Sequence, residues 1–129
     1  MQKEVIRTGP FKDFIADAVR VGDTIYLSGQ VSVDDTGKPL HEGDLAGQVK
    51  VVYDSIKSIL DKYGASMDHI IDEMWLVTDM QDAMTHIEKV FAVRQEAYGR
   101  NPEVSQTMVQ VAGLVMPELL IEIKVVAML

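Results

Sequence analysis

The chain has 129 residues, of which 47% are hydrophobic and 25% are charged, and these fractions are typical of an ordinary globular protein. Its formal net charge of −8, from 20 acidic and 12 basic residues, repels the phosphate backbones of nucleic acids. Cysteine is absent, which excludes disulfides, thiolate metal sites and a catalytic thiol.

We expect one domain over residues 1–129, located in the cytoplasm. The first residues, MQKEVIRTGPFKDF, contain no apolar core long enough for a secretory signal. No apolar run approaches the roughly 20 residues that span a bilayer. Lysine and arginine are scattered and form no basic run. The sequence therefore predicts neither a membrane nor a nucleic acid as a partner.

A β-hairpin is the first predicted element, in FIADAVRVGDTIYLSGQVSV (residues 14–33). Two extended runs flank Gly22-Asp23, a two-residue turn of the kind that hairpins favour. Alternation along the second run places Ser28 and Gln30 on one face and Gly29 on the other. The stretch VDDTGKPLHEGD (residues 33–44) is rich in Asp, Gly and Pro and predicts a loop.

A helix is predicted next, over residues 45–63, because apolar residues recur there at spacings of three and four. Asp44 is its expected N-cap, and Gly64 is expected just beyond its end. The run IIDEMWLVT (residues 70–78) alternates and carries apolar residues on both faces. We therefore expect a strand that is covered at least partly on each side.

A second helix is predicted from Asp79 to Gly99, with Asp82 placed as in a capping box. Two strands follow, in VSQTMVQVAGL (residues 104–114) and LLIEIKVVAML (residues 119–129). The order β-β-α-β-α-β-β combines strand-helix-strand crossovers with hairpins. This order predicts an α+β domain with a mixed sheet and both helices on one face.

The other face of such a sheet needs a cover. Trp75 or its neighbours, together with the Met and Val faces of the late strands, are expected to form an exposed apolar patch. Patches of this kind usually mark an association surface. The sequence therefore predicts a homo-oligomer.

The standard catalytic patterns are absent. The sequence has no glycine-rich phosphate loop and no nucleophile elbow. His41, His69 and His86 are too widely spaced for a metal-ligand pair, so we expect no metal site and no cofactor. Adjacent acidic residues, as in Asp34-Asp35 and Asp72-Glu73, point opposite ways in an extended chain. We interpret them as solvated positions.

Polar residues on the predicted strands are the remaining candidates. Ser28 precedes a glycine that permits close backbone approach. Gln106 shares a strand face with Met108. Glu122 interrupts an apolar strand beside Lys124. From local sequence alone, Ser28 is equally consistent with a simple strand end, whereas Gln106 and Glu122 fit a half-exposed strand face better than a site.

Four segments carry a resemblance to a known family: AVRVGDTIYLSGQVSVDDTGK, VTDMQD, VQVAGL and IEIKVVAM. In this order they resemble the RidA family, also called the YjgF or L-PSP family, over essentially the whole chain. The resemblance implies a chorismate-mutase-like fold and a homotrimer whose sheets form a central barrel, with a cleft at each subunit interface. It also implies enamine and imine deamination, in which 2-aminoacrylate-type intermediates become 2-oxo acids and ammonia. Some members of the family have been described as endoribonucleases or translation inhibitors.

The resemblance assigns roles to particular residues. Ser28 and Gly29 match the family's S-G-Q site strand, and Glu122 matches the cleft glutamate that positions the attacking water. Ser28 and Glu122 are therefore the expected catalytic residues. On the same basis, Gly29, Gln106, Ile15 and Met108 are expected to bind substrate, with Gln106 and Ser28 facing Glu122.

Two positions depart from the family pattern. The family arginine, which grips a substrate carboxylate, is replaced by Gln106, and the cleft tyrosine is replaced by Ile15. A neutral amide donates hydrogen bonds but does not balance a carboxylate charge. Arg20, Arg94 and Arg100 remain as candidates for a replacement charge from a neighbouring subunit.

Two functions are consistent with these residues. The first is an imine or enamine hydrolase of shifted substrate range. The alternative is a non-catalytic trimer that binds a small metabolite or a protein partner in the same cleft. A ribonuclease is disfavoured because RNA cleavage needs a proton-transfer pair and nearby cations, and no histidine lies on a predicted site strand.

Overall fold

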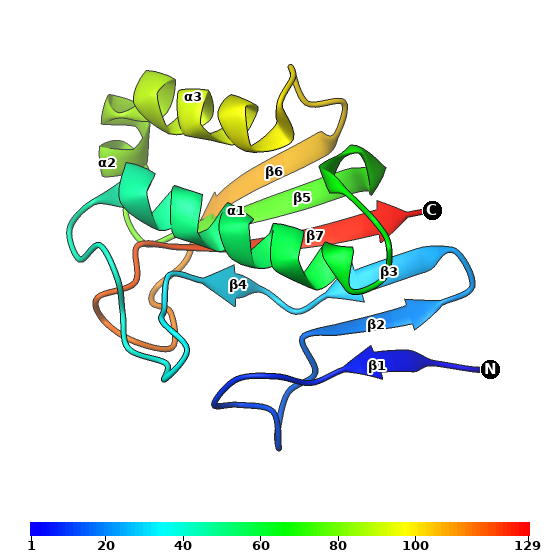
Figure 1. The fold of residues 1–129 in the computed structure, drawn as a ribbon. Coiled ribbons are helices and arrows are strands. Elements are labelled where there is room, and N and C mark those ends of the chain that lie inside the picture. Colours follow the sequence, from blue (N-terminus) through cyan, green and yellow to red (C-terminus); the bar gives the residue numbers. More distant parts are fainter.

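A computed structural model describes all residues, 1–129, and shows one seven-stranded mixed sheet with its helices on one face (Figure 1). The α+β class predicted from the sequence is confirmed. In chain order the elements are β1 (Glu4–Ile6), β2 (Ala18–Val21), β3 (Thr24–Leu27), β4 (Gln30–Val31), α1 (Leu45–Asp61), the 3-10 turn η1 (Met67–His69), β5 (Ile70–Val77), α2 (Met80–Thr85), α3 (Ile87–Tyr98), β6 (Ser105–Gln110) and β7 (Ile121–Met128).

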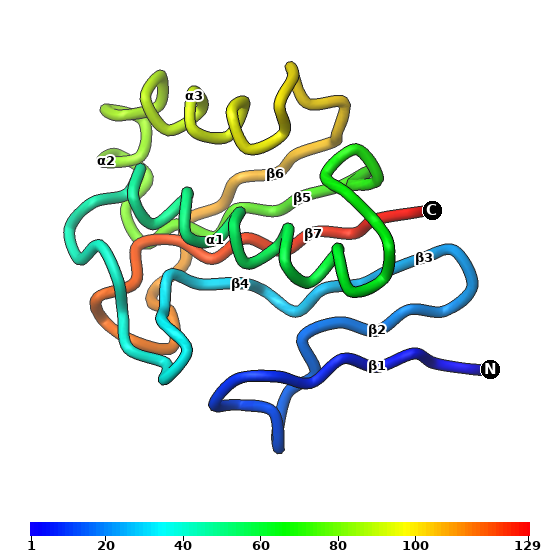
Figure 2. Tube along the Cα trace, viewed as in Figure 1, coloured from blue at the N-terminus to red at the C-terminus, as the bar shows by residue number.

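The last strand holds the two halves of the sheet together. The strand order is β1-β2-β3-β7-β5-β6, and β4 also pairs with β7. The path in Figure 2 shows the red C-terminal strand between the blue N-terminal strands and the green and orange strands of the second half. The β5–β6 pair is parallel and all other pairs are antiparallel. Because β7 pairs with three strands, its residues lie at the centre of the sheet.

Helix α1 covers the sheet with the apolar stripe predicted from its spacing. Val49, Val52 and Ile56 are completely buried. Asp44 caps the helix by accepting a hydrogen bond from the Gly47 amide at 3.1 Å, as expected for an N-cap. Beyond the end of the helix, Gly64 has a φ of +72°, a conformation that glycine adopts without strain.

The predicted second helix is two helices, which corrects the sequence-based expectation. It starts as predicted, since Asp79 accepts a hydrogen bond from the Asp82 amide at 3.0 Å. At His86 the backbone leaves helical angles, with φ −108° and ψ 16°. The His86 Nδ1 atom lies 3.0 Å from the Asp82 carbonyl oxygen, which also accepts from the His86 amide. The ring thus shares the carbonyl that a regular helix uses for its backbone, and α2 ends there.

The strand from Ile70 to Val77 is covered by helices on one side only, so the expectation of cover on both sides is wrong within one chain. Trp75 is 1% exposed and belongs to the core. Its neighbour Met74 is 38% exposed on the outer face. Other exposed apolar residues on β1, β2, β3, β6 and β7 are Val5, Val21, Tyr26, Val109 and Met128. The outer sheet face therefore does carry an apolar surface, but Trp75 is not part of it.

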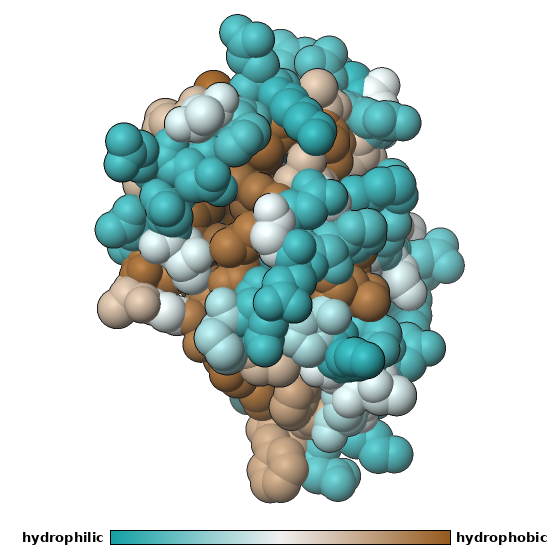
Figure 3. All heavy atoms as spheres, turned by 90° about the vertical axis from the view of Figure 1, so that its left-hand side faces the viewer, coloured by the Kyte–Doolittle hydropathy of each residue, from teal (hydrophilic) through white to brown (hydrophobic).

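A second apolar area lies at the end of the molecule near α2. In Figure 3 this end faces the viewer, and hydrophobic atoms fill its centre inside a polar surround. Met84 of α2 is 47% exposed, and Val115 of the loop between β6 and β7 is 68% exposed. No helix in the structure has the length and apolarity that a membrane crossing requires.

Candidate functional site

The sheet opens locally where β3 passes into β4. Strand β7 pairs with β3 at Val126 and with β4 at Ile123, so the chain between these contacts leaves the ladder. Lys124 lies on β7 at this opening and donates from Nζ to the Leu27 carbonyl oxygen at 2.7 Å. The lysine thereby satisfies a carbonyl that the interrupted ladder leaves without a strand partner.

Gly29 lies in the opening directly against the Glu122 carboxylate. A β-carbon on Gly29 would lie 2.6 Å from Cδ and 2.8 Å from Cγ of Glu122, closer than van der Waals contact permits. Glycine is therefore required for the carboxylate to rest on this backbone. The structure brings together Gly29 and Glu122, two of the residues that the family resemblance assigned to the site.

The position of Glu122 changes its acid-base chemistry. It lies opposite Leu76 of β5 and Val31 of β4, and it is half-buried. Burial raises the pKa of Glu122 above its ordinary value, and the charge of Lys124 opposes this effect only in part. A carboxylate with a raised pKa is a stronger base, so the position is suited to accepting a proton from water.

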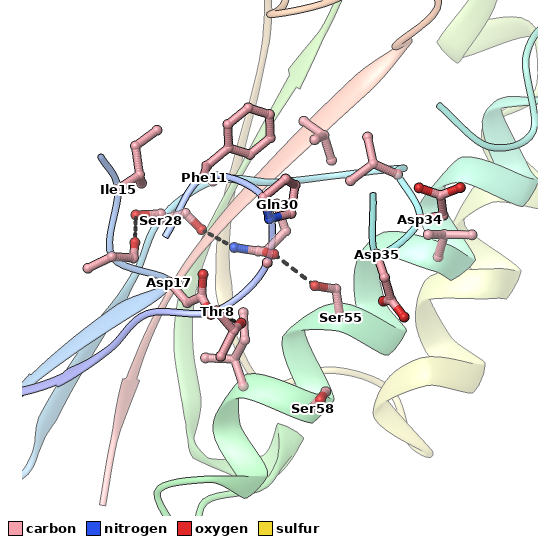
Figure 4. A pocket seen from close by; sticks show the side chains of 18 of the residues that line it. Thr8, Phe11, Ile15, Asp17, Ser28, Gln30, Asp34, Asp35, Ser55 and Ser58 are labelled. Carbon is pink, nitrogen blue, oxygen red and sulfur yellow. Dashed lines mark hydrogen bonds between the residues drawn. The ribbon is translucent and has the colours of Figure 1, made fainter. Parts of the chain in front are cut away.

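Ser28 points to the other side of the strand. Side chains alternate, so the face opposite Gly29 carries Ser28 and also Gln30, which contacts α1 through Ser55. The Ser28 hydroxyl donates to the Ala16 carbonyl oxygen at 2.6 Å (Figure 4). Because its proton is already donated, the hydroxyl offers only lone pairs to a ligand. The arrangement suits a positioning role and provides no base to make Ser28 a nucleophile.

A pocket of about 590 Å³ opens on this side of the strand, between the loop of residues 8–17 and α1. Its wall contains a chain of hydrogen bonds: Ser55 Oγ donates to Gln30 Oε1 at 2.8 Å, and Gln30 Nε2 donates to the Ser28 carbonyl oxygen at 3.0 Å (Figure 4). The predicted residue Ile15 also lines the pocket and is 52% exposed. It supplies an apolar surface without a hydroxyl.

The charges around this pocket are mainly negative. Asp17, Asp34 and Asp35 line it, against one ammonium group from Lys62. Hydrogen bonds from the Thr36 side chain and from the backbone lower the pKa of Asp34, so this group remains ionised. No histidine lines the pocket. This pocket thus favours neutral or cationic ligands over anions.

Gln106 and Met108 lie elsewhere in the molecule. The Gln106 amide donates from Nε2 to Glu73 Oε2 at 2.8 Å, on the helix-covered face of the sheet. Met108 packs against the hydrophobic core on the same face. The expectation that Gln106 faces Glu122 and Ser28 is therefore not met within one chain, because β6 directs this side chain towards the helices.

Glu73 is the polar residue that the sequence interpretation placed wrongly. The sequence predicts that Glu73 is solvated like Asp72, but its side chain is completely buried. It accepts hydrogen bonds from the Tyr53 hydroxyl at 2.7 Å, the Tyr98 hydroxyl at 2.8 Å and Arg94 Nε at 2.6 Å, in addition to the Gln106 amide. The sequence does contain a pattern that indicates burial of Glu73: it lies two and four residues before Trp75 and Val77, so all three share one strand face.

The buried carboxylate also affects its partners. Burial raises the pKa of Tyr53 and of Tyr98, and the nearby charge of Glu73 raises both further. Both tyrosines therefore stay protonated and remain hydrogen-bond donors. Burial acts most strongly, to lower the pKa of Arg94, but the charge of Glu73, the hydrogen bond to it and the two tyrosines together outweigh burial, so the pKa is raised.

Replacing Gly29 with alanine is expected to displace the Glu122 carboxylate while the fold is retained. Gly29 does not have a positive φ, and the atoms that must move belong to one flexible side chain, so the destabilisation should be at the low end of about 1–3 kcal/mol. The displaced carboxyl group becomes more exposed, and its pKa should fall towards the ordinary value. Carboxyl-carbon NMR titration measures this pKa. Gly113→Ala is the matched control, because nothing lies within 4 Å of a β-carbon there.

The fold and this opening define a class of protein: an α+β domain with a mixed sheet and a half-buried glutamate resting on a glycine at a break in the central ladder. A family model described as Endoribonuclease L-PSP matches residues 7–129. The chain therefore belongs to this family, the RidA/YjgF family that the sequence motifs indicated.

Individual relatives extend the comparison. A RutC family protein of Pyrococcus abyssi is 30% identical over 134 residues, which cover 98% of each chain. The 3-aminoacrylate deaminase RutC of Acinetobacter baylyi is 32% identical over 98% of both chains. A crystal structure of the Rid family protein YyfA of Yersinia pestis, described as of unknown function, superposes with a TM-score of 0.85. It covers 99% of this chain and 100% of its own at 23% identity, and supports the fold alone.

Proposed function

We propose that this protein is a homotrimer that hydrolyses reactive imines or enamines in a cleft between subunits, with Glu122 as the residue that handles water. One observation carries the proposal. A half-buried carboxylate with a raised pKa rests on Gly29, where a β-carbon would displace it. The activity for which the Acinetobacter baylyi relative is named, 3-aminoacrylate deamination, supports the same class of reaction.

The chemistry follows from the placement of Glu122. The ionised carboxylate accepts a proton from a water molecule as the water oxygen bonds to the imine carbon. The imine nitrogen takes a proton from solvent, which gives a carbinolamine. Glu122 returns its proton to this nitrogen, the carbon–nitrogen bond breaks, and ammonia leaves as the hydroxyl proton is lost to solvent. The net reaction converts one imine and one water into one carbonyl compound and one ammonia.

Ser28 and Gly29 are assigned to positioning. The Ser28 hydroxyl has lone pairs free for a donor on a ligand in the pocket beside Ile15, because its proton goes to the Ala16 carbonyl; this pocket lies on the face opposite Glu122. The thin glycine backbone separates this hydroxyl from Glu122 on the other face. Ile15 provides an apolar contact at the pocket wall.

The proposal is tested with imines made in situ, because these compounds decay in water. An amino acid oxidase or an amine oxidase supplies a panel of imines, and release of the carbonyl product is followed above the spontaneous rate. We expect at least one imine to be hydrolysed faster in the presence of the protein. If no member of the panel is accelerated, the hydrolase proposal fails.

The trimer is tested separately by sedimentation. The chain has a mass of 14.3 kDa, so a species of three times this mass is expected. The apolar outer face of the sheet supports such an assembly, since it leaves Tyr26, Met74 and Met128 exposed in one chain. A single species at the monomer mass would contradict the proposal of a cleft between subunits.

The pH dependence of the reaction should report Glu122. As a general base it acts only when ionised, so the rate should rise with pH through its pKa, which lies above that of an ordinary glutamate. Lys124 lowers this pKa, so Lys124→Met should move the acidic limb of the rate profile to higher pH. Stopped-flow rates across the acidic range measure the limb. A limb that moves to lower pH would contradict the assignment.

The second candidate is a non-catalytic trimer that binds a small metabolite or a protein partner. It is favoured by the orientation of Gln106, which contributes nothing to the opening at Gly29 within one chain. Saturable ligand binding combined with no acceleration of any imine would select this alternative. A ribonuclease is not proposed, because the pocket lacks histidine and is lined by three carboxylates.

A further inference from the structure

The starting observation is a buried amide at the place where β4 and β7 separate. Val31 is the last residue of β4, and it pairs with Glu122 of β7. In Figure 1 the end of β4, the start of β7 and the start of α1 lie at the same end of the sheet. Gln48 of α1 is completely buried there. Because a buried amide group is costly without hydrogen-bond partners, its contacts show what it holds in place.

Gln48 binds two chain segments that leave the sheet. Its Oε1 atom accepts a hydrogen bond from the Leu120 amide at 2.8 Å, and its Nε2 atom donates to the Glu118 carbonyl oxygen at 3.0 Å. Both partners belong to the segment that enters β7. Nε2 also donates to the His41 carbonyl oxygen at 3.2 Å, in the segment that follows β4. One side chain of α1 thus ties the entry to β7 to the continuation of β4.

The hydrogen bond from Leu120 lies where the β5–β7 ladder ends. Regular antiparallel pairing would exchange two hydrogen bonds between Thr78 and Leu120. The Thr78 amide does donate to the Leu120 carbonyl oxygen at 3.1 Å. The Leu120 amide donates to Gln48 instead of returning to Thr78. Gln48 therefore takes the place of a strand acceptor at this end of β7.

Glu122 lies close to the end of both of its ladders. Its partner on β4 is Val31, the last residue of that strand, and its partner on β5 is Leu76, one residue before the end of β5. The outermost pairs of a ladder open more readily than central pairs, because fewer neighbouring contacts hold them. The placement of the Glu122 carboxylate against Gly29 therefore depends on what holds the chain beyond the strand ends.

His41 shows that the segment after β4 is held under strain. It is the one residue other than glycine with a positive φ, +56°. Such a conformation persists only where surrounding contacts hold it. The His41 carbonyl oxygen accepts hydrogen bonds from the Asp44 amide at 3.0 Å and from Gln48. Gln48 therefore fixes the chain on the β4 side of the contact between Gly29 and Glu122 as well as on the β7 side.

We propose that Gln48 is a positioning residue for the reaction: its amide joins the entry to β7 with the continuation of β4, and thereby holds the Glu122 carboxylate against Gly29. This inference rests on the proposed role of Glu122 as the general base. Gln48 acts through the backbone of both strands and does not touch the substrate. Loss of its amide leaves three backbone groups without their partner and frees Glu122 to move away from Gly29.

The first experiment measures the pKa of Glu122 by carboxyl-carbon NMR in the wild type and in Gln48→Met. Methionine has a similar length and fills the same space, but it cannot make the three hydrogen bonds. Burial is the largest cause of the raised Glu122 pKa, so a carboxylate released from Gly29 should titrate closer to its ordinary value. A folded Gln48→Met protein with the wild-type pKa of Glu122 would overturn the proposal.

Val90→Ala is the control for loss of stability alone. Val90 is a residue of α3 that is 1% exposed, so its truncation removes buried packing and leaves the three hydrogen bonds of Gln48 in place. The pKa of Glu122 should stay at its wild-type value in this variant. An equal fall in Val90→Ala and in Gln48→Met would show that any destabilised variant releases Glu122, which contradicts a specific role of Gln48.

Hydrogen exchange of the wild type tests the same contact without any substitution. The Leu120 amide should exchange slowly and together with the Glu122 amide, since one local opening breaks both. The amides of Gly113 and Val115, which are exposed residues of the same loop, are the fast-exchanging reference. A Leu120 amide that exchanges as fast as these would mean that Gln48 does not hold the entry to β7, and the proposal would fail.

A kinetic cycle tests whether Gln48 acts through Glu122. Rates are compared for the wild type, Q48M, E122Q and the double variant, on the imine that the wild type accelerates most. We expect Q48M to lower kcat by about tenfold and to leave KM within about twofold, because a misplaced base slows the chemical step. In the E122Q background the same substitution should have no further effect. Losses that multiply in the double variant would overturn the positioning role.

The outcomes distinguish this inference from the proposed function. If the wild type accelerates no imine, the hydrolase proposal fails, and the Glu122 pKa and the Leu120 exchange rate still decide whether Gln48 positions the carboxylate. If an imine is accelerated, and Q48M keeps both the wild-type kcat and the wild-type pKa of Glu122, the hydrolase proposal stands and the role of Gln48 fails.

Discussion

Replacing Glu73 with alanine should lower the free energy of unfolding by about 3–5 kcal/mol, because removal of one partner of the ion pair leaves the Arg94 charge uncompensated. The substitution removes the acceptor of four hydrogen bonds at once, those from Tyr53, Arg94, Tyr98 and Gln106. Tyr53 and Tyr98 are buried, and Arg94 keeps its charge since the pKa of its guanidinium remains far above neutral. Urea denaturation followed by tryptophan fluorescence measures the effect, as Trp75 donates to the Tyr53 hydroxyl beside the cluster.

The neighbouring acid is the matched control for this prediction. Asp72 is exposed and bonds the Ser105 hydroxyl at 2.5 Å, so Asp72→Ala should change stability by no more than about 0.5 kcal/mol. Glu73→Gln should fall between the two, because it keeps an acceptor oxygen and loses the charge. Equal effects of Glu73→Ala and Asp72→Ala would mean that the buried cluster contributes nothing to stability.

Replacing Glu122 with glutamine should reduce imine hydrolysis by about 10²–10⁴-fold, the usual contribution of a general base. Glutamine has nearly the same shape, so it still fits against Gly29 and the fold should be unaffected. The substitution therefore removes the group that accepts the proton and keeps the size and shape of the side chain. Rates are measured on whichever imine of the panel the wild type accelerates most.

Two controls separate catalysis from packing in this experiment. Glu88→Gln removes an exposed carboxylate on α3, away from the opening, and should leave the rate unchanged. The pH profile of the Glu122→Gln protein should lose its acidic limb, because the group that titrates is gone. A variant that keeps both the wild-type rate and the acidic limb would remove Glu122 from the mechanism.

The local patterns in the sequence were sufficient for most of the fold. The Gly22-Asp23 turn, the Asp44 cap and the Asp79 cap each act over a few residues, and each occurs in the structure as predicted. The shortest strands were not predicted, because β1 has three residues and β4 has two, too few for a periodic pattern. The interruption at His86 also has no periodic signature, because the apolar stripe continues through it.

The candidate site was predictable only in part. The family motifs predict Glu122 and Gly29 as site residues. Strand periodicity alone favours a solvated position for Glu122 beside Lys124. Their contact depends on the break between β3 and β4, at which β7 changes its partner from β3 to β4. The opposite directions of Ser28 and Glu122 follow from the same break and are not encoded near either residue.

The sequence by itself determined the class of fold, the hairpin, the helix caps at Asp44 and Asp79 and the absence of any thiol chemistry, because these depend on residue type and short-range spacing. Only the tertiary structure decided what Glu73 does. Its four donors come from α1, α3 and β6, between 20 and 33 residues away along the chain. Burial of a charge depends on partners that arrive from distant segments, and the hydrogen bond to Glu73 keeps the Gln106 amide away from the opening where Glu122 rests on Gly29.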